Sequence, residues 1–112
     1  MDELTQIVRD KKSGSMKVYG TAHSFNDIAD TTGVHVSTEN LTDIRVNKAA
    51  MKVSFGAGVT YTMLIAALKE QGLALPNLPS LPHLNVVGSV ITGSHGGGLE
   101  HQGLASYVTM IF

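Results

Sequence analysis

Residues 76–98 restrict the fold more than any other part of the sequence, because they hold all three prolines and a glycine-rich run. The prolines fall within residues 76–82, which therefore cannot form a regular helix or a central strand. Residues 93–98 read Gly-Ser-His-Gly-Gly-Gly, and such a run lets backbone N–H groups form an anion-binding nest. The run indicates either a diphosphate site or a flexible turn. It is not a Walker loop, since no Gly-Lys-Ser/Thr follows.

The rest of the sequence predicts an α+β fold with mixed small sheets and two helices. Apolar residues at helical spacing predict helices over residues 2–12 and 60–71, the second ending at Gly72. Short apolar runs predict strands over residues 16–19, 34–37, 44–46, 51–55 and 107–112. The third and fourth of these strands are expected to form a hairpin. The intervening segments predict a tight turn at residues 47–50, a long loop at residues 20–33 and a glycine-rich coil at residues 88–98.

Composition excludes several classes of protein. The net charge is −1, with 8 basic and 9 acidic residues, so a nucleic-acid or anionic-membrane surface is not expected. The absence of cysteine removes disulfides, thiolate metal sites and cysteine nucleophiles. No apolar run is long enough to cross a membrane, and the charged first residues lack the apolar segment of a signal peptide. We therefore expect a cytoplasmic location.

Motifs for other chemistries fail on inspection. Gly56 and Gly58 suggest a dinucleotide fingerprint, but Tyr61 replaces its third glycine and Pro76 falls where an acidic residue belongs. The five histidines show no HExxH spacing, so no metal site is predicted, and no G-x-S-x-G elbow is present. His23, in a polar loop, is either a nucleophilic imidazole that meets a ligand or a solvated side chain.

Two stretches, residues 18–29 and 53–98, acquire meaning together, and they contain the motifs GTAHSFN (20–26) and SLPHLNVVGSVITGSHGGG (80–98). With LASYV at residues 104–108, they follow the order found in the FAD-binding domain of the vanillyl-alcohol oxidase/PCMH flavoprotein superfamily, which this sequence resembles. Within it, the sequence is most similar to alditol (xylitol) oxidases and their relatives, the aldonolactone oxidases. The resemblance covers nearly the whole chain and implies an α+β, PCMH-type FAD-binding half-domain.

The resemblance also implies roles for individual residues. His23 is expected to be joined covalently to the flavin methyl carbon. Ser80 is expected to lie over the flavin and touch the substrate, as a catalytic and cofactor-contacting residue, and Pro79 stands where relatives usually have an alanine that influences oxygen access. The remaining cofactor contacts are expected at Gly20, Thr21, Ala22, Ser24, Phe25, Asn26, Gly88, Ser89, Thr92, Gly93, Ser94, His95, Gly96 and Gly97.

The activity implied is oxidation of a terminal alcohol of a small polyol, with hydride transfer to covalent FAD and reduction of O2 to H2O2. Residues 1–112 are expected to form part of that FAD-binding domain, with its first strand, its remainder and the substrate domain elsewhere. The chain alone is then expected to be inactive. Two alternatives stay open: a standalone, non-catalytic protein that self-associates through exposed edges, and the FAD domain of an aldonolactone oxidase or flavin dehydrogenase.

Overall fold

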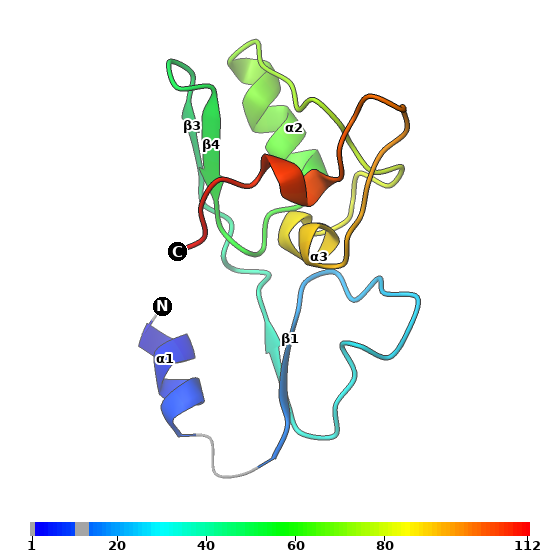
Figure 1. The fold of residues 1–112 in the computed structure, drawn as a ribbon. Helices are drawn as coiled ribbons and strands as arrows, with labels where there is room; N and C mark the ends of the chain where they lie inside the picture. The colour runs from blue at the N-terminus through cyan, green and yellow to red at the C-terminus, as the bar shows by residue number, and fades with distance from the viewer. Residues whose placement is uncertain (1, 11–13) are drawn as a thin grey trace.

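The computed structural model describes residues 2–10 and 14–112 and confirms a small α+β fold (Figure 1). Two separate two-stranded sheets are present in this part of the chain. The elements follow one another as α1 (Asp2–Arg9), β1 (Met16–Tyr19), β2 (Val34–Ser37), β3 (Ile44–Asn47), β4 (Lys52–Phe55), α2 (Tyr61–Glu70), α3 (Val86–Ile91) and a 3-10 helix (Leu104–Tyr107). Among the described residues, no helix has the length and apolar character needed to span a membrane.

The first sheet pairs β1 and β2 in parallel, from Met16 opposite Val34 to Tyr19 opposite Ser37. Parallel neighbours need a long crossover, and here residues 20–33 supply one that contains no regular secondary structure. The predicted loop is therefore confirmed. Its first residues leave the end of β1 and face the helical half of the molecule (Figure 1).

The second sheet is the predicted hairpin of β3 and β4, in antiparallel register from Ile44 opposite Phe55 to Asn47 opposite Lys52. The Asn47 side chain closes the turn by accepting a hydrogen bond from the Ala50 N–H group at 3.0 Å. The observed strands agree with the predicted ones to within one residue at each end.

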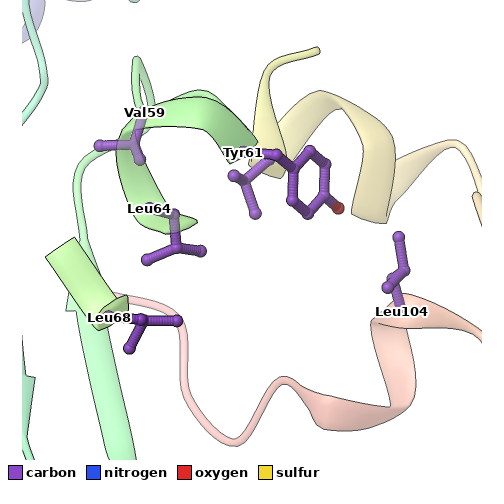
Figure 2. Packing of buried hydrophobic residues seen from close by; sticks show 6 residues of the cluster. Val59, Tyr61, Leu64, Leu68 and Leu104 are labelled. Atoms are coloured by element: carbon purple, nitrogen blue, oxygen red, sulfur yellow. The ribbon is translucent and has the colours of Figure 1, made fainter. Parts of the chain in front are cut away.

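The predicted helix over residues 60–71 is also confirmed as α2. The Thr60 side chain caps its start by accepting from the Met63 N–H group, and Gly72 follows its end with a φ of +68°, a left-handed conformation that glycine adopts without strain. The inner face of α2 carries Tyr61, Leu64 and Leu68. These side chains form one buried cluster with Val59, Val86 and Leu104 (Figure 2). The β3–β4 hairpin packs against this cluster through partly buried apolar side chains.

Three expectations about secondary structure need correction. The first helix ends at Arg9, and the predicted residues 11 and 12 lie outside the described residues. Residues 86–91 form a third helix, α3, where a coil from Gly88 was predicted. Residues 107–112 form no strand: the 3-10 helix ends at Tyr107 and the following apolar residues are exposed. A strand needs a hydrogen-bonding partner, and the described chain offers this segment none.

The α3 helix forms in spite of its glycine because its first turn is capped and its inner face is buried. The Asn85 side chain accepts a hydrogen bond from the Gly88 N–H group at 2.7 Å. Val86 and Ser89 are buried on the side that faces α2. A cap is worth about 1 kcal/mol, which offsets the roughly 1 kcal/mol that glycine costs inside a helix.

Candidate functional site

The loop after β1 meets the segment that leads into α3. The Asn85 N–H group donates a hydrogen bond to Thr21 Oγ1 at 3.3 Å. Two residues further along the loop, the His23 ring lies against the ring of His83, with centroids 5.1 Å apart and planes tilted by 59°. A Cβ added to Gly20 would lie 2.5 Å from Asn85 Cγ, so the loop backbone passes directly over this side chain. The GTAHSFN and SLPH motifs are therefore neighbours in space.

The glycine-rich run meets the other end of the proline-containing segment. A Cβ at Gly96 would collide with the Asn77 side chain and with the Leu78 carbonyl oxygen. Only a glycine permits so close an approach between two backbones. Segment 76–83 thus contacts the loop of residues 20–26 at one end and the glycine-rich run at the other. All three predicted parts of the site are brought together.

Asn85 holds this arrangement and was not recognised in the sequence. It is only 5% exposed, and its Nδ2 group donates to the carbonyl oxygens of Ala57 at 2.6 Å and Val59 at 3.5 Å. Its Oδ1 atom caps α3 through Gly88. One side chain therefore fixes the turn between β4 and α2 and the start of α3. An asparagine immediately before an apolar run, as Asn85 is before Val86, is a capping signal, and it could have revealed this residue.

The loop of residues 20–26 presents an open surface with unused donors. Thr21 to Asn26 are exposed, and the Phe25 ring is fully so. Ala22 has a φ of +51°, a left-handed conformation of the kind found in backbone nests that bind anions. Within the described chain, the N–H groups of residues 22–26 donate to no protein acceptor. Such a loop can bind an anionic or carbonyl-rich ligand.

The glycine-rich run begins where α3 ends. Gly93 has a φ of +75° and reverses the chain, after which the Ser94 N–H group donates to the Ser89 carbonyl oxygen at 3.0 Å. The Ser94 carbonyl oxygen in turn accepts from the Leu104 N–H group at 3.1 Å. His95 Nδ1 lies 3.1 Å from the Gly96 carbonyl oxygen. The run is therefore anchored at Ser94, while Gly97 has open space on its side-chain face.

Two hydroxyl groups among the predicted cofactor contacts face the protein. Tyr61 donates to Ser89 Oγ at 3.1 Å, and Ser89 is only 6% exposed. Burial raises the pKa of the Tyr61 phenol, and the hydrogen bond to Ser89 acts in the opposite direction. The Thr92 hydroxyl donates back to the Gly88 carbonyl oxygen at 2.9 Å. Ser80, by contrast, is exposed, and its hydroxyl makes no hydrogen bond with the described protein.

The arrangement fits a long, partly anionic cofactor better than a metal ion. The glycines at positions 20 and 96 let the segments pack directly on Asn85 and Asn77, while Gly93 and Gly97 have no atom within 4 Å on their side-chain faces and leave room for a ligand. The Asn77 Nδ2 atom is buried and has no hydrogen-bond partner among residues 2–10 and 14–112, so a donor remains unused beside the glycine-rich run. No group of three histidine or acidic residues that could hold a metal ion occurs in the same part of the chain.

Comparison with known proteins shows the family to which the chain belongs. A protein-family model described as an FAD binding domain matches residues 1–110, which places the chain among FAD-binding flavoproteins. The chain belongs to this FAD-binding domain family, as the two motifs implied. It is 40% identical over 110 residues to an alditol oxidase from a Streptomyces species. The mouse L-gulonolactone oxidase is 34% identical over 111 residues, and a putative D-arabinono-1,4-lactone oxidase from Neurospora crassa is 30% identical over 112 residues.

These relatives are much longer than the chain. The alignments cover 96%, 97% and 97% of this chain but only 26%, 25% and 20% of the respective relatives. The chain therefore spans between a fifth and about a quarter of the length of these relatives. Since all three are oxidases by name, the domain is of the kind found in FAD-linked oxidoreductases.

Proposed function

We propose that this chain is the FAD-binding portion of an oxidase that removes hydride from a terminal alcohol of a small polyol and reduces O2 to H2O2. The observation that carries the proposal is the contact between His23 and the segment of residues 80–83. His83 follows the proposed substrate-facing Ser80 by three residues, so this contact supports a site in which the segment carrying Ser80 borders the proposed attachment point of the cofactor. The 40% identity to an alditol oxidase supports the choice of a polyol.

In this reaction the residues of the chain would hold the cofactor and orient the substrate. Bound FAD supplies a two-electron acceptor for hydride. The free N–H groups of residues 22–26 and the glycine-rich run at residues 93–98 would hold its diphosphate and ring edges. His23 would anchor the flavin covalently, so that the cofactor is not lost between turnovers. The exposed Ser80 hydroxyl would bind a substrate hydroxyl and fix the carbon that gives up hydride.

Lactone oxidation is the second candidate, and the relatives give it specific support. The mouse relative is named for L-gulonolactone and the Neurospora relative for D-arabinono-1,4-lactone. Peroxide release from xylitol, sorbitol and an aldonolactone separates the candidates. The assay uses the complete reading frame that encodes these residues. Peroxide from the polyols supports alditol oxidation, and peroxide from the lactone alone would replace it with the second candidate.

The covalent link is tested at His23. The complete protein should give a fluorescent flavin band on a denaturing gel, and His23→Ala should remove that band. His101→Ala is the matched control, because His101 is also an exposed histidine but lies outside the proposed contacts. A fluorescent band from the His23→Ala protein would place the attachment elsewhere.

The substrate contact is tested at Ser80. Because Ser80 is exposed and makes no internal hydrogen bond, Ser80→Ala should leave folding and FAD content unchanged. Loss of one hydrogen bond to the substrate is worth about 1–3 kcal/mol, or roughly 5- to 150-fold in kcat/KM. Steady-state kinetics with xylitol measures this change. Wild-type kinetics in the variant would remove Ser80 from the substrate site.

A further inference from the structure

The tilted pair of His23 and His83 rings lies where the loop after β1 meets segment 76–83, and the proposed function gives His83 no chemical role. The two rings come from the loop after β1 and from the segment before α3, and their centroids are 5.1 Å apart. Both side chains are exposed, so neither is there to fill the core. The pair does not belong to a three-ligand metal site either, since no third histidine or acidic ligand joins it among the described residues.

A hydrogen bond beside the pair fixes the backbone segments that carry the two histidines relative to each other. Thr21 and Asn85, which are joined by the bond from the Asn85 N–H group to Thr21 Oγ1, each lie two residues from one histidine of the pair. Gly20 packs on the Asn85 side chain immediately beside this bond. The loop and the segment are therefore held together next to the pair, and the two rings lie against each other with centroids 5.1 Å apart.

We propose that His83 accepts the proton that His23 must lose when it bonds to the flavin, and so assists attachment of the cofactor. The inference rests on the proposed covalent link at His23. Imidazole exchanges protons readily near neutral pH, and His83 is the imidazole whose ring lies against that of His23. His83 thus acts through His23, and its function is completed before the first turnover.

The chemistry of attachment balances with dioxygen as oxidant. A ring nitrogen of His23 forms one bond to the flavin methyl carbon. The methyl group gives up one proton, the His23 ring gives up another to His83, and the flavin ring system keeps the electron pair and is reduced by two electrons. Dioxygen then accepts the electron pair and two protons and leaves as H2O2. The His83 proton passes to solvent, to which this ring is exposed.

The test follows the rate of attachment, which does not depend on substrate turnover. The complete protein is produced without flavin, FAD is added, and covalent flavin is measured over time by fluorescence on denaturing gels and by mass. Positioned proton acceptors contribute about 10²- to 10⁴-fold to rates, so His83→Ala should attach FAD at least 10²-fold more slowly than wild type. It should still bind FAD, as measured by flavin retained on filtration. His101→Ala is the control and should attach at the wild-type rate.

Rescue separates proton transfer from a structural role. Because the His83 side chain is exposed, imidazole in solution can reach the space that His83→Ala leaves, and it should restore much of the lost rate. His83→Gln keeps a polar side chain and should remain slow without imidazole. Attachment at the wild-type rate in His83→Ala, failure of imidazole to accelerate it, or loss of FAD binding would each overturn the inference. A wild-type protein that binds FAD only non-covalently would also overturn it, while the peroxide assay would still decide the oxidase proposal.

Discussion

Replacing Gly20 with alanine tests the central claim that the loop after β1 rests on Asn85. The new Cβ would lie 2.5, 2.6 and 2.8 Å from Cγ, Cβ and Oδ1 of Asn85. These atoms cannot move aside freely, because the same side chain is bonded to Gly88 and Ala57 at 2.7 and 2.6 Å. Either the loop moves away from Asn85, or the Asn85 side chain moves and loses its hydrogen bonds to Gly88 and Ala57.

The expected loss of stability follows from the hydrogen bonds of Asn85 that the substitution would break. Losing the cap on α3 costs about 1 kcal/mol. Leaving the Ala57 carbonyl oxygen without its partner costs about 1–3 kcal/mol more, at the low end because Ala57 is only half-buried. Because alanine has less conformational freedom than glycine in the unfolded chain, the substitution also stabilises the folded state by roughly 0.4–1 kcal/mol. We therefore expect Gly20→Ala to lower the free energy of unfolding by about 1–3 kcal/mol.

Urea unfolding followed by circular dichroism measures this difference, and Gly97→Ala is the matched control. Gly97 also lies in the proposed cofactor site, but a Cβ there would meet no atom within 4 Å. The control should be as stable as wild type or more stable by up to about 1 kcal/mol. If the two variants unfolded at the same urea concentration, the packing of the loop on Asn85 would be refuted.

Two further predictions concern the core and the glycine-rich run. Tyr61→Phe should destabilise the protein at neutral pH by about 1–3 kcal/mol, because the buried Ser89 hydroxyl loses its donor. Burial raises the pKa of Tyr61 above 10.0, so the stability that the neutral phenol contributes is present below that pH and is lost as the pH rises through the raised pKa. Between neutral pH and about pH 11, Tyr61→Phe should therefore lose less stability than wild type. An equal loss in the two proteins would contradict this reasoning. Gly96→Ala should weaken FAD binding by about tenfold or more, as measured by fluorescence titration, because its Cβ would displace Asn77. Gly103→Ala is the control and should bind FAD like wild type, since a Cβ at Gly103 meets no atom within 4 Å and Gly103 lies outside the proposed contacts. Equal affinities of the two variants would contradict the packing of the glycine-rich run on segment 76–83.

Local patterns in the sequence were sufficient for most of the regular elements. The hairpin of β3 and β4 and the helix α2 combine apolar periodicity with turn and cap residues such as Asn47 and Gly72, so their signals are contained within a few residues. The helix α3 was missed because Gly88 argued against it locally. Its stability depends on the Asn85 cap and on burial of Val86 against residues distant in sequence.

The candidate site was likewise predictable from the sequence only in part. The residue types at His23, Ser80 and the glycine-rich run carried enough information to connect them through a family resemblance. No local pattern shows that Asn85 supports the loop or that His83 lies against His23, because each contact joins residues about 60 positions apart. The burial of the Ser89 hydroxyl under Tyr61 likewise depends on how α2 and α3 pack. Such contacts become visible only once the chain has folded.

The bond between Thr21 and Asn85 also has a consequence for when the site can form. It spans 64 positions, so closing it costs more chain entropy than the hairpin or either neighbouring helix, and it is expected to form after them. During synthesis at roughly 5–20 residues per second, a nascent chain would present His23 for several seconds before Asn85 is made. The cofactor therefore meets a finished cradle only after the glycine-rich run has left the ribosome.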